Sequence, residues 1–179
     1  MTPRTRTPQI LWAALFVSTI LLGAVAFIMK QPPQPPQAIM LPAIAGVAFT
    51  TVVISFVLPR QLMTKGLTAT LTPLIVEQPN PAAEVTFREA APPLRVFHDP
   101  SAAWKKALFA YQQPLIVSLA LAESVALYGL VLVSLGFPRP TVVPFLVVCW
   151  VLQIARFPTD AKLAAAVKAA TGVELPLGT

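Results

Sequence analysis

A single carboxylate, Glu123, lies near the middle of an apolar stretch, Pro114–Gly136, that is long enough to cross a lipid bilayer. A charged side chain at the bilayer centre costs roughly 2.5–3.5 kcal/mol on insertion scales, so such residues usually face a partner, a cavity or an ion path. A carboxyl in this position has the chemistry to bind a proton or a cation. Glu123 is therefore the first candidate for a functional side chain.

Other polar residues occur at a similar depth in the remaining apolar stretches. Counted from the middle of each stretch at 1.5 Å of rise per residue, they fall within about 6 Å of one level. Serine and threonine in membrane helices also bond their own helix carbonyls or a neighbouring helix, which is the simpler interpretation for those types. For Glu123 we expect hydrogen-bond partners among Thr50, Thr51 and Gln153, with Tyr128 one to two turns further out. The other members of this level are Ser18, Thr19 and Ser124.

Four apolar stretches predict transmembrane helices. Hydrophobic residues make up 56% of the chain and charged residues 11%, which is far from the balance of a globular domain. Each stretch approaches the ~20 residues that a hydrocarbon core of about 30 Å requires. They are Ile10–Met29, Ala38–Leu58, Pro114–Gly136 and Thr141–Phe157, of which the last is the shortest, with Trp150 and Arg156 as interfacial anchors. The predicted fold is an all-α membrane protein of four transmembrane helices in two antiparallel hairpins.

The distribution of basic residues predicts the orientation. With a cytoplasmic N-terminus, eleven of the thirteen lysines and arginines fall inside, which satisfies the positive-inside rule. Both termini are then cytoplasmic in a multi-pass protein of the plasma (inner) membrane. The net charge of +6 needs no nucleic-acid partner, because no basic patch with interleaved aromatic residues occurs. The inside set is Arg4, Arg6, Arg60, Lys65, Arg88, Arg95, Lys105, Lys106, Arg156, Lys162 and Lys168, and the outside set is Lys30 and Arg139.

The first stretch has an alternative interpretation as a secretory signal. Arg4 and Arg6 precede it, and Ala24-Val25-Ala26 near its end has the small-residue pattern of a cleavage site. Twenty apolar residues are long for a signal core. We therefore expect a retained helix.

The connections divide the chain into four parts. Residues 1–58 form the first hairpin, whose helices are joined by the proline-rich residues 31–37, and residues 114–157 form the second hairpin. Residues 59–113 are a cytoplasmic, proline-containing loop with an interfacial helix from about residue 100. Residues 158–179 are a cytoplasmic helix and tail.

Local signals place structure in the two cytoplasmic parts. Asp99-Pro100 is a strong helix start, because the carboxylate accepts unpaired amide hydrogens and proline suits the first helical position. Upstream, Glu84–Phe97 alternates weakly and predicts a short hairpin that Pro92-Pro93 interrupts. Thr159 or Asp160 caps a C-terminal helix that Gly172 ends, with Leu163, Val167 and Ala170 on one face. That face packs on its own protein or, alternatively, lies on a surface or a partner.

A flank of small residues runs along the third predicted span. Small residues let membrane helices approach closely, so this flank predicts a packing surface. Its members are Ser118, Ala122, Ala126 and Gly129.

The segment Ala120–Leu132 resembles the ion-carrying helix of the proteolipid c subunit of rotary ATP synthases. In that family a mid-membrane glutamate is followed by a small residue and then by Tyr-Gly-Leu-Val, as in Glu123-Ser124 and Tyr128–Val131. Pro59-Arg60-Gln61 is similar to the Arg-Gln pair at the family's cytoplasmic connection. The resemblance implies that Glu123 is a reversibly protonated carboxyl and that Tyr128 shapes its surroundings.

No enzyme signature is present, and we expect neither a cofactor nor a metal site. His98 is the only histidine, and the single cysteine, Cys149, excludes an intrachain disulfide. Small size and helix faces of small residues favour a non-catalytic subunit or accessory factor of a larger membrane complex, with partners in the bilayer or a second copy of the chain. The alternative is a proton- or cation-handling protein that uses Glu123.

Overall fold

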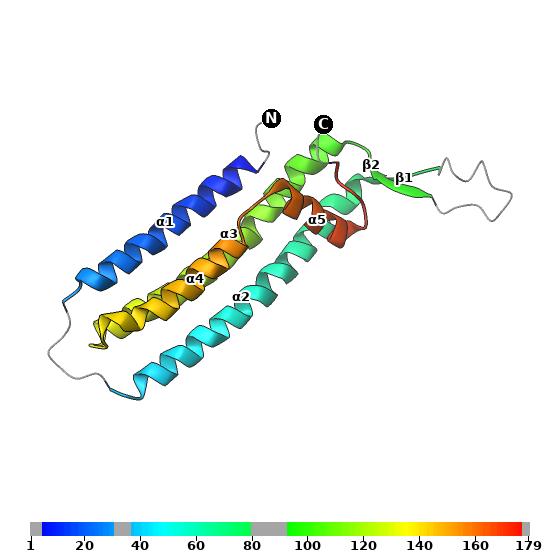
Figure 1. The fold of residues 1–179 in the computed structure, drawn as a ribbon. Helices are drawn as coiled ribbons and strands as arrows, with labels where there is room; N and C mark the ends of the chain where they lie inside the picture. The colour runs from blue at the N-terminus through cyan, green and yellow to red at the C-terminus, as the bar shows by residue number, and fades with distance from the viewer. Residues whose placement is uncertain (1–4, 31–36, 80–92, 177–179) are drawn as a thin grey trace. The chain divides into compact units, whose positions relative to one another are not determined.

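The computed structural model describes residues 5–30, 37–79 and 93–176 of the 179-residue chain. These residues are mostly helical (Figure 1). The proline-rich connector at 31–36, Arg4, Arg88 and the first half of the predicted 84–97 hairpin lie outside the described residues. In chain order the elements are α1 (Arg6–Ile28), α2 (Met40–Leu71), the 3-10 helix η1 (Thr72–Leu74), β1 (Ile75–Gln78), β2 (Leu94–Phe97), α3 (Pro100–Ser134), the 3-10 helix η3 (Arg139–Val142), α4 (Val143–Ala155) and α5 (Asp160–Thr171).

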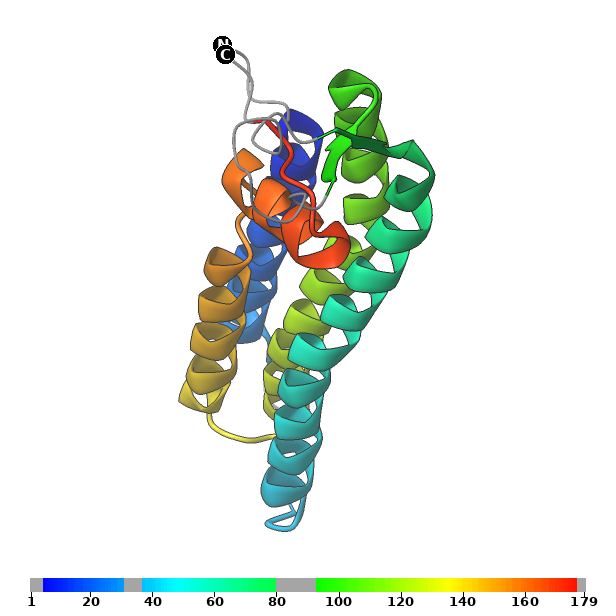
Figure 2. The same ribbon diagram turned by 90° about the vertical axis from the view of Figure 1, so that its right-hand side faces the viewer.

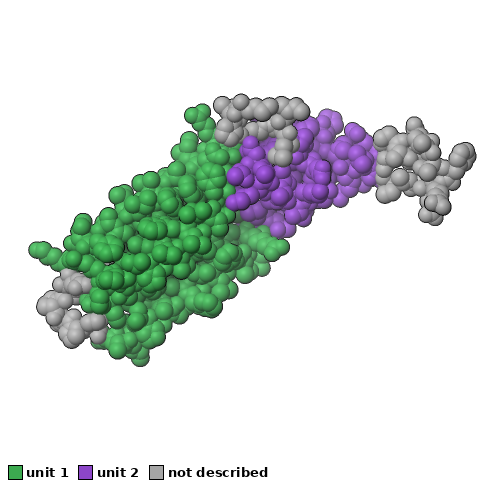
Figure 3. All heavy atoms as spheres, viewed as in Figure 1, with its two compact units in different colours: residues 1–61, 113–158 green, residues 62–112, 159–179 purple. Residues whose placement is uncertain are grey.

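The chain forms two compact units, which Figure 3 colours separately. Unit 1 comprises residues 1–61 and 113–158, and unit 2 comprises residues 62–112 and 159–179. The two long helices, α2 and α3, each contribute to both units. In unit 1 α1 packs against α4 and η3, and Figure 2 shows the helices of this unit running alongside one another.

Among the described residues, three helices have the length and apolarity to cross a membrane. They are Arg6–Ile28, the run Met40–Leu74, and Pro100–Ser134, and a fourth results if Arg139–Ala155 and Asp160–Thr171 are counted as one broken span. The chain is therefore a helical protein with the composition of a multi-pass membrane protein. The predicted fourth span begins with the short helix η3, and α4 itself has only 13 residues.

Unit 1 exposes large apolar side chains on the outside of its helices. Leu21 of α1, Phe49 of α2 and Val151 of α4 are each 60% exposed or more. So many exposed large apolar side chains are unusual in soluble monomers and are typical of a surface that meets lipid or other proteins. The buried interior is built from smaller groups, including Ala26, Ala122, Ala126, Val133, Cys149 and Leu152.

The predicted helix starts are confirmed. Asp99 Oδ1 accepts hydrogen bonds from the amides of Ser101 (2.8 Å) and Ala102 (3.1 Å), so it caps α3. The helix then continues through Pro114 into the third span. At α5, Thr159 Oγ1 accepts from the Lys162 amide at 3.2 Å, and Gly172 ends the helix with φ 75°.

One two-stranded sheet joins the helical elements. The strand at Leu94–Phe97 falls within the predicted hairpin, but its antiparallel partner is Ile75–Gln78, which lies further upstream. Ile75 pairs with Phe97 and Gln78 with Leu94. The upstream strand follows directly on η1 and was not predicted from the sequence.

Unit 2 has a small core of its own. Leu67 and Leu71 of α2, Ala103 and Ala107 of α3, and Leu163 and Val167 of α5 are fully buried. Trp104 Nε1 donates to the carbonyl of Pro176 at 2.9 Å, which holds the tail. The burial of Leu163 and Val167 shows that the apolar face of α5 packs within its own unit.

We predict that Asp99→Ala lowers the thermal unfolding temperature at pH 7, because two amides at the start of α3 lose their acceptor. The hydrogen bond from the Ala102 amide, followed by those from Ser101, holds the pKa of Asp99 below its usual value. A lowered folded-state pKa stabilises the fold above the ordinary aspartate pKa of about 3.9, and this stabilisation is lost as the pH falls through the folded value.

The difference in unfolding temperature between Asp99→Ala and the wild type should therefore be smaller at acidic pH. Circular dichroism melts in detergent at pH 7 and at pH 3 measure it, with Asp99→Asn as the control that keeps an acceptor oxygen. A deficit that is equally large at both pH values would contradict the role of the ionised carboxylate.

Candidate functional site

Glu123 is paired with a serine of the first helix. Ser18 Oγ of α1 donates a hydrogen bond of 2.6 Å to Glu123 Oε1 of α3. Both side chains are half-buried inside unit 1. The expected partners Thr50, Thr51 and Gln153 were wrong, because α3 turns this carboxyl toward α1.

The residue after Ser18 joins α1 to a different helix. Thr19 is fully buried, and its hydroxyl lies 2.8 Å from the carbonyl of Phe16 and 3.2 Å from Gln153 Oε1 of α4. Gln153 is also fully buried, and its Nε2 has no hydrogen-bond partner among the described residues. Two consecutive residues of α1 thus place the carboxyl of Glu123 and the amide of Gln153 at the same level.

Thr50 and Thr51 of α2 have separate environments. Thr51 is buried, donates to the carbonyl of Val47 at 3.0 Å, and lies 3.2 Å from the hydroxyl of Tyr128. Thr50 is exposed, and its hydroxyl donates to the carbonyl of Gly46 of its own helix at 3.0 Å. The predicted site residues therefore divide into three parts. Glu123 and Gln153 lie at the level of Ser18 and Thr19, Thr51 pairs with Tyr128 between α2 and α3, and Thr50 faces outward.

The flank of small residues on α3 is buried along its whole length. Ser118, Ala122, Ala126 and Gly129 are all in the interior of unit 1. A Cβ added to Gly129 would lie 2.9 Å from Phe145 Cβ and 2.9 Å from Val142 Cγ2, so only glycine permits this approach. On the other side of α4, a Cβ at Gly23 would lie 3.1 Å from Leu146 Cδ1.

The sequence predicts an interfacial anchor at Arg156, but the guanidinium turns inward and bonds Ser118 of α3 and Ser55 of α2. The sequence does place Ser55, Ser118 and Arg156 at a similar depth, because each lies within a few residues of the same end of its predicted span. Nothing in the sequence indicated that the arginine would turn toward the serines.

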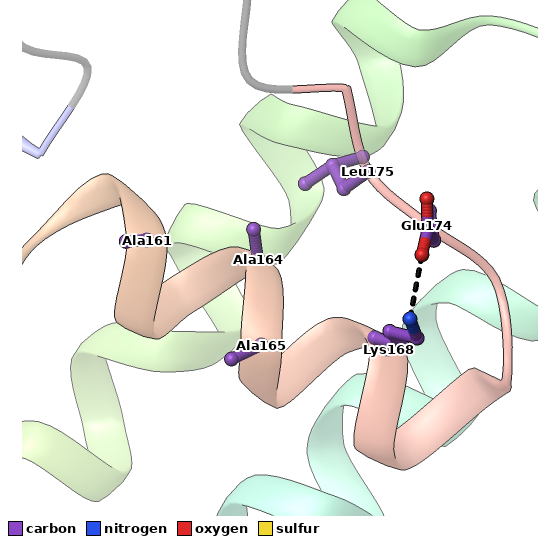
Figure 4. A pocket seen from close by; sticks show the side chains of 6 residues that line it. All are labelled: Ala161, Ala164, Ala165, Lys168, Glu174 and Leu175. Carbon is purple, nitrogen blue, oxygen red and sulfur yellow. Dashed lines mark hydrogen bonds and ion pairs between the residues drawn. The ribbon is translucent and has the colours of Figure 1, made fainter.

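The pocket drawn in Figure 4 contains none of the predicted site residues. It is a shallow hollow of about 290 Å³ in unit 2, between α5 and the tail. Three alanines line it, and Lys168 and Glu174 form an exposed ion pair at 2.5 Å beside it. The hydrogen bond from Lys168, and then its charge, lower the pKa of Glu174. An exposed pair of this kind with an alanine lining offers little chemistry for a ligand.

No protein-family model matches the chain, and neither does any curated protein or any solved structure. The resemblance of Ala120–Leu132 to the c-subunit helix stays a prediction.

We predict that Gly129→Leu destabilises unit 1 by about 1–3 kcal/mol, the usual cost of overpacking, because the new side chain meets Phe145 and Val142. Val131→Leu is the matched control, since Val131 is 43% exposed. Unfolding in a denaturing detergent series compares the variants, and equal stability of the two would show that this flank is not closely packed.

Proposed function

We propose that this chain is a non-catalytic subunit or accessory factor of a larger membrane assembly. The surface of α2 is the observation that carries the proposal. Only 17% of the most apolar part of α2 is buried, the same share as in α1, against 44% in α3. A helix that is joined to its own unit along so little of its surface has most of its circumference left for lipid or for partner helices.

One face of α2 has the composition of a helix contact. Ala43, Gly46 and Thr50 are exposed, and a Cβ at Gly46 would meet nothing within 4 Å. Thr50 already bonds the Gly46 carbonyl, so the face presents no unsatisfied hydroxyl hydrogen. Membrane helices associate chiefly through close packing of small residues, because lipid tails are as apolar as leucine. A glycine inside a helix costs roughly 0.5–1 kcal/mol relative to alanine, which a close helix contact would offset.

An open apolar groove adjoins this face. It has a volume of about 270 Å³ and contains no charged side chain. The groove extends the area that a partner helix beside α2 would cover. It is lined by Ala45, Ala48, Phe49 and Val52 of α2, Val125 of α3, and Pro144, Phe145 and Val148 of α4.

Gly46→Leu should remove copurifying membrane partners, or a second copy of the chain, without unfolding the protein, because the added side chain meets no atom of its own unit. Val17→Leu on a different helix, α1, where Val17 is 53% exposed, is the control. Affinity purification in a mild detergent followed by native electrophoresis measures the effect. Equal recovery of partners with both variants would contradict an assembly role for this face.

A second candidate function is proton or cation handling at Glu123. The 2.6 Å bond from Ser18, with Thr19 and Gln153 at the same level, supports it. A carboxyl surrounded by hydroxyl and amide groups in an apolar bundle has ligands for a proton or a small cation. The resemblance of the surrounding segment to the c-subunit helix agrees with this candidate.

Glu123→Gln should abolish labelling by a hydrophobic carbodiimide and any ion flux into liposomes, while the fold is kept because an amide still accepts the bond from Ser18. Glu77→Gln removes an exposed carboxylate outside the apolar stretches and should change neither measurement. Unchanged flux and labelling in Glu123→Gln would leave Glu123 with a structural role.

We also propose that both termini are cytoplasmic and that the membrane is the plasma (inner) membrane. The asymmetry of eleven basic residues to two supports this orientation. Reporter fusions after Thr179 and within residues 59–113 should both be cytoplasmic. An external reporter after Thr179 would overturn the four-span topology.

A further inference from the structure

Gln153 of α4 makes two contacts with the first helix, α1. Its backbone carbonyl accepts a hydrogen bond of 2.7 Å from Trp12 Nε1, and its side-chain Oε1 lies 3.2 Å from the hydroxyl of Thr19. Residues 12 and 19 are separated by about two helical turns, so they lie on one face of α1. That face of α1 is directed toward α4.

The same face continues at Gly23, where the two helices approach closely. Gly23 is buried, and a Cβ added to it would lie 3.1 Å from Leu146 Cδ1. Since Thr19 meets Gln153 and Gly23 meets Leu146, α1 and α4 run antiparallel at this contact. Close packing of this kind leaves α1 little freedom to slide along α4 or to turn against it.

The contact of Ser18 with Glu123 depends on how α1 lies on α4. Consecutive residues of a helix differ by about 100° in direction, so when Thr19 faces α4 its neighbour Ser18 faces α3. There Ser18 Oγ donates its hydrogen bond of 2.6 Å to Glu123 Oε1. A rotation of α1 that took Thr19 away from Gln153 would therefore also take Ser18 away from the carboxyl.

Packing alone does not explain a glutamine at position 153. The side chain is fully buried, and its Nε2 has no hydrogen-bond partner among the described residues. A buried N–H without an acceptor costs free energy, and a leucine would fill a similar volume without one. What glutamine adds is the contact with Thr19. It keeps this contact in either orientation of its amide, because Nε2–H can donate to the Thr19 oxygen.

We propose that Gln153 is a positioning residue for Glu123 and acts on it through α1. Gln153 holds Trp12 and Thr19, these contacts fix the rotation of α1, and that rotation keeps the Ser18 hydroxyl on the carboxyl. The hydrogen bond of Ser18 to Glu123 is thereby coupled to the contact between Thr19 and Gln153. The role of Gln153 in ion handling rests on the function proposed for Glu123, whereas the coupling of the two contacts does not.

Infrared difference spectroscopy of the full chain in detergent tests the coupling. Subtracting the spectrum of the Glu123→Gln derivative of each protein isolates the bands of the Glu123 carboxyl, whether or not the protein moves ions. Ser18→Ala should shift these bands, because the carboxyl loses its donor. Gln153→Leu should shift them in the same direction. In the Ser18→Ala background Gln153→Leu should add no further shift, since the donor through which it acts is gone.

Two results would overturn the positioning role. If Gln153→Leu leaves the bands of Glu123 in place, the rotation of α1 does not depend on the glutamine. If the shift caused by Gln153→Leu is as large in the Ser18→Ala background as in the wild type, the two residues act independently.

Thermal unfolding and a second variant separate positioning from loss of the fold. Gln153→Leu should not lower the unfolding temperature, because it removes an unpaired N–H and leaves the Thr19 hydroxyl on the carbonyl of Phe16 at 2.8 Å. Thr19→Val breaks the same contact from the side of α1 and should reproduce the band shift of Gln153→Leu. Unchanged bands in a folded Thr19→Val protein would count against the proposal.

Ser124→Ala is the matched control. Ser124 follows Glu123 in α3, but its hydroxyl donates to the carbonyl of Ala120 of its own helix at 2.9 Å. This variant should leave the carboxyl bands unchanged. A shift as large as that of Gln153→Leu would show that the bands respond to any nearby substitution, and the coupling would be refuted.

Ion flux into liposomes distinguishes the positioning role from the function proposed for Glu123. Bands that shift as expected in a protein without Glu123-dependent flux would support the coupling and contradict the function. Glu123-dependent flux, together with bands that Gln153→Leu leaves in place, would contradict the coupling alone.

Discussion

Apolar surroundings provide no water for a buried polar group, and the arrangement of unit 1 depends on that constraint. A polar side chain placed among apolar helices must find its hydrogen bond on a neighbouring helix or on its own backbone. Ser18 and Thr19 meet this requirement on α3 and α4, through Glu123 and Gln153. Because the two residues are consecutive, one rotation of α1 about its axis satisfies both contacts. Other rotations would take Ser18 away from the carboxyl of Glu123.

Close packing is the second determinant, and α4 is its centre. Gly23 of α1 and Gly129 of α3 allow the backbones of those helices to approach Leu146 and Phe145, on either side of α4. In lipid, contact between small residues supplies association energy that the hydrophobic effect does not. The shortest of the four helices in unit 1 thus carries contacts to each of the other three, because Arg156 at its end also bonds α2.

This distribution of contacts has a functional consequence. Helix α2 has 32 residues and an apolar stretch that is mostly exposed, whereas α4 has 13 residues and buries Leu146, Cys149, Leu152 and Gln153. A chain that concentrates its internal contacts on α4 leaves α2 available to other molecules. The assembly role rests on this contrast and is separate from the chemistry of Glu123, so either can hold without the other.

The sequence alone determined the long helices and several of their ends. Apolar length set the long helices, Asp99-Pro100 and Thr159 set two helix starts, and Gly172 set an end, because these effects depend on residues that are adjacent in the chain. The small flank of α3 was predicted from spacing and is buried as expected. Local chemistry of this kind needs no knowledge of neighbouring helices.

Only the tertiary structure decided which polar residues meet. The position of a residue along a predicted span follows from counting residues, but the rotation of each helix about its axis does not. Consecutive residues of a helix differ by about 100° in direction, so Thr50 faces outward while Thr51 meets Tyr128. The same rotation directs Glu123 to Ser18 instead of Gln153. Arg156 turns into the bundle because Ser55 and Ser118, which are distant in the chain, bring their oxygens to one place. The pairing of β1 with β2 is likewise a contact between separated segments, and hydrogen bonds between such segments depend on how the helices pack.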